Sequence, residues 1–296
     1  MPFLKDLELL WNTPKLLRGK SPADYYEYLG DDVVEGESSG FTDPSKVLWL
    51  NLGYWANART YPEAAVALAC QVAEAGQLGP GDHVLDVGFG LAEQDFLWLE
   101  RYGVAQIRGL NITPMHVERA RERVQARGLS DRIDLQLGSA TEIPFDADSF
   151  DKVTALECAF HFDPRERFFE EAFRVLRPGG RLSIADGLPA PGHAAPGFLQ
   201  KLLLKRWAIP LGNFYDRDEY CRRLAAVGFS DVQCRSIRHY VFPGNSKYRR
   251  LRHGGRTVEE AIVELTPEEI ERCAGIQDWE PSGLTDYAIF SAQKPG

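Results

Sequence analysis

Short apolar runs alternate with longer amphipathic segments from about residue 80 onward. Runs rich in β-branched and aliphatic residues predict five strands, over residues 83–88, 106–112, 133–139, 151–158 and 181–187. Between these runs, apolar positions spaced three and four apart predict helices, in "LAEQDFLWLERY", "TPMHVERARERVQARG" and "RERFFEEAFRVL". Buried parallel strands that alternate with helices are typical of a doubly wound, Rossmann-like α/β fold.

The C-terminal part of the chain follows a different pattern. A helix is predicted over residues 217–229 and a strand over 231–241, followed by a polar, irregular insertion at about 243–283 and a last strand over 286–293. Two strands separated by a long insertion suit an antiparallel edge on a parallel sheet. We therefore expect a mostly parallel sheet of seven strands, the five above and these two, with an antiparallel C-terminal edge.

The pattern divides the chain into three segments. Residues 1–79 lie outside the repeat and are expected to form an N-terminal helical lid, residues 80–187 form the cofactor-binding core, and residues 188–296 add cap helices, the last strands and the insertion to the same domain. An apolar stripe at helical spacing begins the chain: Leu4, Leu7, Leu10 and Trp11. We expect it to dock on the protein's own core, with a membrane or partner protein as the alternative.

Composition narrows the class of protein. A formal charge of -9 argues against a nucleic-acid-binding surface, and the basic run "KYRRLRHGGR" is interpreted as a solvated face, with anion binding as the alternative. The five cysteines are far apart and form no C-x-x-C pair, so we expect reduced thiols in a cytoplasmic protein. No run of apolar residues is long enough to span a bilayer, and no carboxylate–histidine cluster has metal-ligand spacing, so neither an integral membrane segment nor a metal is expected. Monomer and homodimer both remain open.

The stretch "HVLDVGFGLAEQD", residues 83–95, carries the candidate cofactor site. Gly88 and Gly90 allow a tight turn and close approach of the backbone to a ligand at the carboxyl edge of the sheet. A dinucleotide site would have a third glycine where this chain has Glu93, and an acid there, together with Asp86, would repel a pyrophosphate. The pattern acid-x-Gly-x-Gly instead suits S-adenosylmethionine, which has no phosphate and carries cationic ammonium and sulfonium groups.

Five motifs together resemble a known family. The stretches "VLDVGFG", "LNITPMHVERAR", "LGSATEIPFDADSFDKV", "LECAFHF" and "FRVLRPGGRL" follow the order and spacing of class I S-adenosylmethionine-dependent methyltransferases. The match is strong over residues 45–187 and looser in the tail. With "NLGYW", the motifs look most like the branch of erythromycin-type macrolide and sugar O-methyltransferases that act on natural products.

The resemblance implies roles for matching residues. Asp86 would face the methionine ammonium, and Asn111 would stand where most of the family place a ribose-binding acid. His116 would take the position of the family's glutamine, while Ser139 and Ala140 would replace the usual adenine-binding aspartate. The resemblance places further cofactor contacts in the same motifs: Gly88, Phe89, Gly90, Gln94, Ile112 and Glu157.

The segment "LECAFHF" leaves the fourth predicted strand beside the cofactor and supplies candidate catalytic groups. Histidine suits the removal of a hydroxyl proton near neutral pH, so His161 is the candidate base or acceptor-orienting residue, with a structural hydrogen bond as the alternative. Glu157 would contact cofactor or acceptor, or cap the next segment. Asp186 would orient a histidine or contact substrate, or lie in an exposed turn. His193 and His239 are lesser base candidates.

The flanking segments are candidates for covering the site. Tyr54, a candidate cofactor contact, and Trp55, a candidate substrate contact, would close over the sulfonium by cation–π attraction, or pack an N-terminal helix on the core. The apolar stretch 196–215, which includes Trp207, would roof a pocket for a bulky acceptor, or serve as a dimer contact or plain core. The sequence predicts an O-methyltransferase of a small natural-product-like acceptor, with a C- or N-methyltransferase or a non-methylating cyclase as alternatives.

Overall fold

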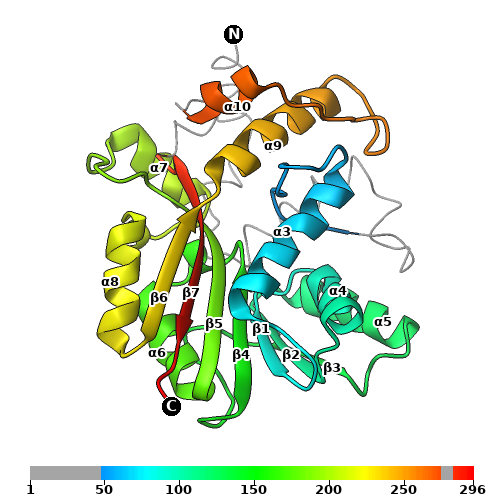
Figure 1. Cartoon of the computed structure of the whole chain (residues 1–296), viewed down its shortest axis with the longest axis vertical. Coiled ribbons are helices and arrows are strands. Elements are labelled where there is room, and N and C mark those ends of the chain that lie inside the picture. The colour runs from blue at the N-terminus through cyan, green and yellow to red at the C-terminus, as the bar shows by residue number, and fades with distance from the viewer. Residues whose placement is uncertain (1–47, 275–282) are drawn as a thin grey trace.

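The computed structural model describes residues 48–274 and 283–296 of the chain. These residues form a seven-stranded sheet of order β3-β2-β1-β4-β5-β7-β6 (Figure 1). Its strands are β1 (His83–Val87), β2 (Gln106–Asn111), β3 (Ile133–Leu137), β4 (Phe150–Leu156), β5 (Leu176–Leu188), β6 (Ser230–Ser236) and β7 (Asp286–Gln293). All neighbours among β1 to β5 are parallel, whereas β7 runs antiparallel to both β5 and β6. The predicted fold class, including the antiparallel C-terminal edge, is confirmed.

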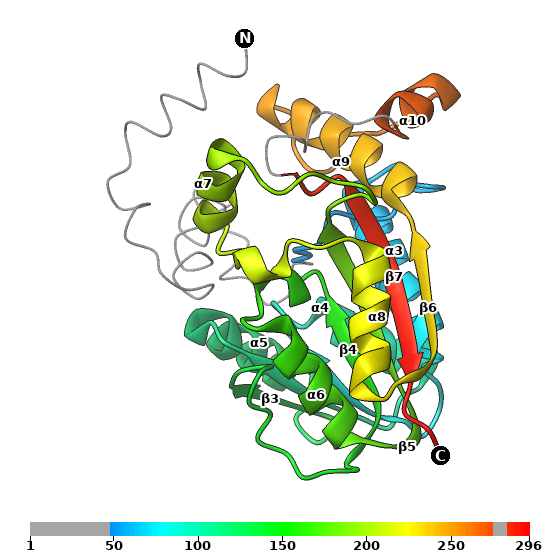
Figure 2. The same cartoon turned by 90° about the vertical axis from the view of Figure 1, so that its left-hand side faces the viewer.

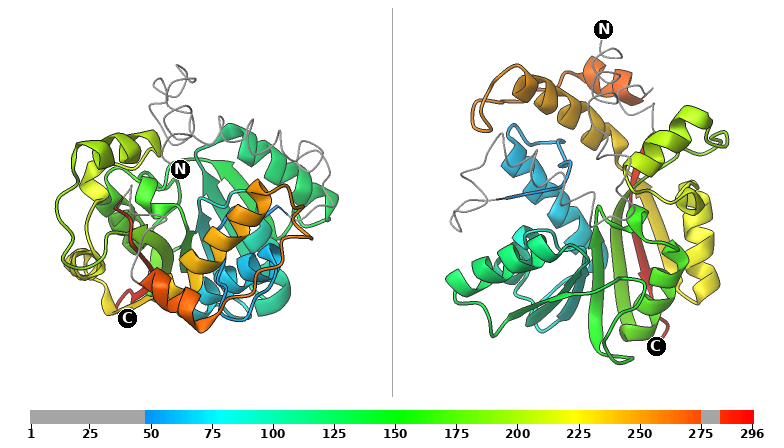
Figure 3. Two further views of the ribbon diagram at one scale, coloured as in Figure 1. Left: turned by 90° about the horizontal axis from the view of Figure 1, so that it is seen from above. Right: turned by 180° about the vertical axis from the view of Figure 1, so that it is seen from behind.

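Five helices cover the two faces of the sheet. On one face lie α3 (Tyr61–Gly76), α4 (Glu93–Tyr102) and α5 (Pro114–Ala126), and on the other α6 (Arg165–Val175) and α8 (Arg217–Val227) (Figures 1 and 3). Two large apolar clusters fill these layers, one against each face. Because both faces of the sheet are covered, its central strands are buried almost continuously rather than at alternate positions.

Three more helices lie beyond the carboxyl ends of the parallel strands: α7 (Phe198–Arg206), α9 (Arg238–His253) and α10 (Pro267–Ala274) (Figures 1 and 2). Two short 3-10 turns, η2 (Ala159–His161) and η3 (Leu211–Asn213), connect the core to this upper layer. No helix in residues 48–274 and 283–296 combines the length and apolar character needed to cross a bilayer.

The predicted strand over 231–241 is wrong in its second half. β6 ends at Ser236, which pairs with Ala288 near the start of β7, and the ladder has almost no partner strand left beyond that point. The chain turns into α9 at Arg238, which buries Val241 and Phe242. The insertion after residue 243 is likewise helical in α9 and α10 rather than irregular, whereas residues 275–282 lie outside the described part of the chain.

The boundary drawn at residue 79 does not coincide with the edge of the core. Within the predicted lid segment, α3 packs on the sheet: Leu68 and Val72 are fully buried in the same apolar cluster as Val84 of β1. A capping box between Thr60 and Glu63 starts this helix. The apolar stripe at residues 4–11 lies outside the described residues.

Candidate active site

A cavity of about 220 Å³ opens at the carboxyl ends of β1, β2, β3 and β4. The sheet order reverses between β1 and β4, because β2 lies on one side of β1 and β4 on the other. Ligands of open α/β sheets bind at such a switch point, since the loops on either side diverge and leave a crevice. The turns after these four strands line the cavity, and the segment 48–51 closes one side of it.

The glycine turn after β1 brings backbone to the cavity wall. Gly88 has φ +76°, a left-handed conformation that favours glycine, and a Cβ there would lie 2.6 Å from both Cβ and Sγ of Cys158. Gly90 has φ +56°, with the place of its missing Cβ 3.1 Å from Leu50. The turn can therefore take this path only because both residues lack a side chain.

Asp86 lies behind this turn rather than in the cavity wall. Its carboxylate is fully buried and accepts hydrogen bonds from Thr154 Oγ1 (2.9 Å) and Gln94 Nε2 (2.9 Å). Gln94 Nε2 also donates to the carbonyl of Phe89 (3.1 Å), so the amide hydrogens of Gln94 face inward and its carbonyl oxygen is left as an acceptor on a residue that lines the cavity. A carbonyl oxygen suits an ammonium group as a hydrogen-bond acceptor. Asp86 does not line the cavity, but its bond to Nε2 holds the Gln94 side chain.

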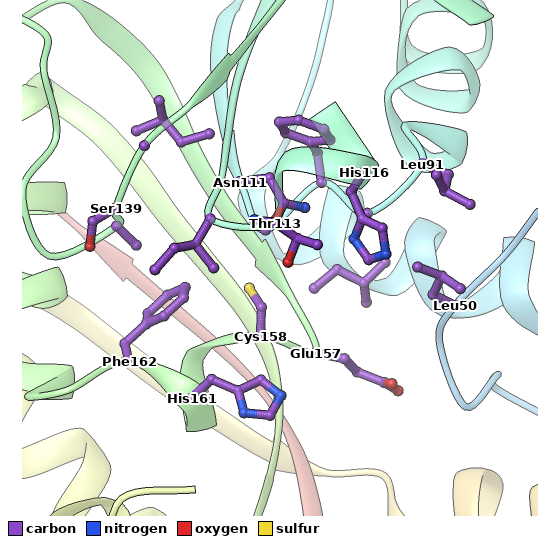
Figure 4. Close-up of a pocket in the computed structure, with 18 of the residues that line it drawn as sticks. Leu50, Leu91, Asn111, Thr113, His116, Ser139, Glu157, Cys158, His161 and Phe162 are labelled. Carbon is purple, nitrogen blue, oxygen red and sulfur yellow. The ribbon is translucent and has the colours of Figure 1, made fainter. Parts of the chain in front are cut away.

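The turn after β2 supplies polar groups to a second wall. Asn111 Oδ1 accepts from the Thr113 amide (3.0 Å), which holds the side-chain amide at the cavity edge. Burial lowers the pKa of His116 to about 4, so its ring is neutral at physiological pH. Thr113 does not cap α5 with its side chain, and its buried hydroxyl has no hydrogen-bond partner in the described part of the chain. Figure 4 shows these three residues side by side on the cavity.

His161 faces this wall from the opposite side of the cavity (Figure 4). Its Nδ1 lies 3.1 Å from the backbone carbonyl of Ala208, and because a carbonyl can only accept, Nδ1 carries the hydrogen. The basic lone pair is then on Nε2. Burial lowers the pKa of His161 to about 4, so the ring is neutral and Nε2 is unprotonated at neutral pH.

Glu157 ties the cavity to the segment that precedes α3. It lies directly after β4 with φ +54°, and its carboxylate accepts from the Leu52 amide (2.9 Å) and the Tyr287 hydroxyl (2.5 Å). Burial raises the pKa of Glu157 to about 7. Glu157 therefore both lines the cavity and anchors a neighbouring segment, so the two roles expected of it are not exclusive.

Most of the residues singled out in the sequence converge on this cavity. Eleven of them line it: Gly88, Phe89, Gly90, Gln94, Asn111, Ile112, His116, Ser139, Ala140, Glu157 and His161. The other seven candidate cofactor, substrate or base residues do not line it: Tyr54, Trp55, Asp86, Asp186, His193, Trp207 and His239. The cavity lining alone does not assign a role to any of these residues, but it brings together side chains from four separate turns.

The residues outside the cavity have identifiable structural partners. Trp55 is buried and packs on Tyr248 of α9, and Tyr54 packs on Tyr240. Trp207 packs with Leu204 and Ile209 below α7. These three aromatic side chains pack on other parts of the protein, and none of them lines the cavity.

Asp186 is fully buried rather than in an exposed turn. It accepts hydrogen bonds from the Phe160 amide (3.2 Å) and the Tyr220 hydroxyl (3.3 Å), and it lies 3.7 Å from the Arg165 guanidinium. Its contact with the backbone of η2 places it beneath the turn that carries His161. Asp186 thus bonds the main chain of the turn directly before His161.

Several lining residues were not singled out in the sequence, among them Leu48, Leu50, Asn51, Thr113, Cys158, Phe162 and Asp163. The stretch "NLGYW" lies in the correct segment of the chain, but only its aromatic residues Tyr54 and Trp55 were predicted as ligand contacts, and Leu50 and Asn51 were not. Cys158 and Phe162 flank residues that were identified. Cys158 lies against the glycine turn and Phe162 lies across from the turn after β2. Both positions depend on the direction of the chain after β4, which the local sequence does not predict.

Glu93 does not line the cavity, so its charge does not face a ligand there. Its carboxylate is buried, forms an ion pair with Arg123 of α5, and accepts from the Leu48 amide (2.6 Å). The expected repulsion of a pyrophosphate by Glu93 is therefore not supported by its position. The acid instead joins α4, α5 and the segment at residue 48 into one frame around the site.

Replacing Glu157 with glutamine is expected to reduce the pH dependence of stability. Because the folded-state pKa of Glu157 is raised from 4.5 to about 7, the native protein holds this proton more tightly than the unfolded chain does. The associated stability is present below pH 4.5 and is lost as the pH rises through 7, by up to about 3 kcal/mol. Urea unfolding at pH 5.5 and pH 8 should show a smaller loss of unfolding free energy in Glu157→Gln than in the wild type. An equal loss in both proteins would contradict the raised pKa.

The fold and cavity define an enzyme of the doubly wound class with a nucleoside-type cofactor site. A family model described as a methyltransferase domain matches residues 85–184. Erythromycin 3''-O-methyltransferase from Saccharopolyspora erythraea is 39% identical over 282 residues, covering 92% of this chain and 89% of the relative. The 27-O-demethylrifamycin SV methyltransferase from Amycolatopsis mediterranei is 29% identical, covering 86% of this chain and 94% of the relative.

The crystal structure of the cyclase SpnF has the same fold, with a TM-score of 0.67, 23% identity, and coverage of 90% of this chain and 94% of that chain. At this identity the likeness concerns the fold alone. The sequence relationship to erythromycin 3''-O-methyltransferase is much closer and extends over nearly the whole of both chains. The chain belongs to the class I S-adenosylmethionine-dependent methyltransferases, in the group of natural-product enzymes that includes this relative.

The residues of the cavity fit the cofactor of this family, S-adenosylmethionine. The Gly88–Gly90 turn lines the cavity with main chain and no side chain. Gln94 presents an acceptor, and the Thr113 hydroxyl is buried without a partner in the described residues. Gln94 would hold the amino acid end, and Asn111, His116 and Thr113 would hold the ribose. When bound, the cofactor supplies an electrophilic methyl group on a positively charged sulfur.

Proposed function

We propose that this enzyme transfers the methyl group of S-adenosylmethionine to a hydroxyl of a macrolide, a polyketide or an attached sugar, with His161 as the proton acceptor. The observation that carries the proposal is the state of His161: a neutral ring in the cavity wall whose Nδ1–H is held by Ala208, so that Nε2 accepts. The proton of the hydroxyl passes to Nε2 as the O–C bond forms and the S–C bond breaks. Proton removal matters for an alcohol, which is a poor nucleophile while it keeps its proton.

The acceptor is expected to approach from the His161 side of the cavity. The opposite wall is occupied by the groups suited to ribose, and His161 and Phe162 lie across from them (Figure 4). Helix α7, which ends two residues before the Ala208 carbonyl that bonds His161, exposes Phe198, Leu199 and Leu202, at 81%, 50% and 49% of their surface. An apolar surface beside the reacting group suits a bulky acceptor that brings only one hydroxyl into the cavity.

The names of the relatives suggest two acceptors with which to test the proposal. The purified enzyme is incubated with S-adenosylmethionine carrying a labelled methyl group and with either erythromycin lacking the 3''-O-methyl group or 27-O-demethylrifamycin SV. Label recovered as an ether on either acceptor supports the proposal. Label on carbon or nitrogen would contradict hydroxyl transfer, and an unlabelled, rearranged product would indicate a cyclase.

A further inference from the structure

The loop between α7 and α8 holds the backbone of the turn that carries His161. Asn213, at the end of η3, is only 2% exposed. Its Nδ2 donates both hydrogens to main-chain carbonyls, to Phe160 at 3.0 Å and to Phe162 at 2.6 Å. These two carbonyls lie on either side of His161 in the chain, so one side-chain amide fixes the peptide planes before and after it.

The same loop also holds the imidazole ring. Ala208, whose carbonyl accepts from Nδ1 of His161, has φ +51°, a left-handed conformation that is strained for a non-glycine residue. The end of α7 maintains this conformation, because the Ala208 amide donates to Lys205 (3.1 Å) and the Ile209 amide to Leu204 (2.8 Å). Backbone and ring of His161 thus both depend on residues 208–213.

The core holds the other end of the turn. Asp186 accepts from the Phe160 amide at 3.2 Å, and Arg165 Nε donates to the Ala159 carbonyl at 3.1 Å. These contacts fix where η2 begins but do not engage the carbonyls of Phe160 and Phe162. Loss of Asn213 would therefore leave the start of η2 in place and free the part that sets the direction of the imidazole ring.

We propose that Asn213 is a positioning residue of the methyl-transfer reaction, which clamps the carbonyls of Phe160 and Phe162 so that the His161 ring stays bonded to Ala208 and presents Nε2 to the acceptor. The catalytic part of this inference rests on the proposed role of His161 as the base. The positioning part concerns the ring alone and can be measured without an acceptor.

The first test is nitrogen-15 NMR of histidine-labelled protein, with the His161 signals assigned from their loss in His161→Gln. In the wild type, His161 should be a neutral Nδ1–H tautomer from pH 8 down to about pH 5, because burial lowers its pKa to about 4. In Asn213→Ala we expect a mixture of tautomers and a titration midpoint at least about one pH unit higher, as the ring moves toward solvent. Unchanged His161 signals in this variant would overturn the proposal.

Two further variants separate positioning from general damage. Asn245→Ala removes another buried asparagine, which is 4% exposed and donates to the Leu52 carbonyl at 3.1 Å, and it should leave the His161 signals unchanged. Asn213→Ser keeps one donor and serves if the alanine variant does not fold. It should give an intermediate tautomer population, and wild-type His161 signals in the serine variant would then overturn the proposal.

Kinetics with an acceptor that the enzyme methylates then tests the link to catalysis. Asn213→Ala should lower kcat by about 10-fold or more, with KM for S-adenosylmethionine within about twofold of the wild type. In a His161→Gln background the same change should cost nothing further, whereas a full additional loss would show that Asn213 does not act through His161. Normal kcat in His161→Gln itself would remove the base role while the NMR result for the ring would still stand.

Discussion

Replacing His161 with glutamine is expected to lower kcat by about 100- to 10,000-fold, the usual contribution of a positioned general base. Glutamine can still donate to the Ala208 carbonyl, but it has no basic nitrogen to take up the hydroxyl proton. The affinity for S-adenosylhomocysteine should stay within about threefold, because the groups suited to the cofactor lie on the opposite wall. Calorimetric titration and a labelled-methyl assay together measure both quantities.

His193→Gln provides the matched control for this experiment. His193 lies outside the cavity lining, bonds the nearby Ala190 carbonyl (3.2 Å) and packs on the Phe214 ring. The same chemical change there should leave kcat within about twofold of the wild type. A His161→Gln enzyme that methylates a hydroxyl at the wild-type rate would sink the base assignment, and it would favour an acceptor that needs no deprotonation.

Replacing Arg123 with methionine is expected to destabilise the protein by about 3 to 5 kcal/mol, since it leaves the Glu93 carboxylate buried and unpaired. Arg123 is 3% exposed, and besides pairing with Glu93 it donates to the Leu91 carbonyl at 2.6 Å. Its loss also weakens the frame that holds residue 48 against the site. Urea denaturation at fixed pH gives the difference in unfolding free energy.

Two comparison proteins make the Arg123 result interpretable. Arg119→Met removes an exposed ion pair with Glu122 on the same helix, and it should cost less than about 1 kcal/mol. The double variant Glu93→Gln with Arg123→Met removes the buried charge together with its partner and should recover part of the lost stability. An Arg123→Met protein as stable as Arg119→Met would mean that the buried pair contributes nothing measurable.

The proposal for Asn213 gives the cap a role in catalysis as well as in acceptor binding. The loop that holds the turn of His161 follows α7 directly, and α7 carries the exposed apolar residues Phe198, Leu199 and Leu202. An acceptor that settles against α7 would therefore contact the same element that sets the imidazole ring. The helix that contacts the acceptor would then also set the direction of the His161 ring.

The local pattern of the chain was sufficient for the central fold and for one wall of the site. Strands β1 to β5 fall on short runs rich in aliphatic residues that alternate with amphipathic segments. In "VLDVGFG", Gly88 is needed because a Cβ there would clash with Cys158. Motifs of this kind act within a few residues, so their chemistry is legible without the tertiary structure. Asn111 and His116, named from the family resemblance, line the same cavity as Glu157 and His161, which were named from the end of the fourth predicted strand.

Contacts between distant segments decided the rest. The chain after Ser236 leaves the sheet because β7 runs out as a partner, which the alternating residues of 231–241 do not reveal. Trp55 and Trp207 were expected as substrate contacts, yet Trp55 is buried against α9, Trp207 packs on Leu204 and Ile209 beside α7, and neither lines the cavity. His161 Nδ1 donates to the Ala208 carbonyl, and Asn213 donates to the carbonyls of Phe160 and Phe162 on either side of His161, from about fifty residues away along the chain. Local residue preferences set the elements and their turns. The tautomer of the buried His161 ring instead depends on the carbonyl that the fold places beside it.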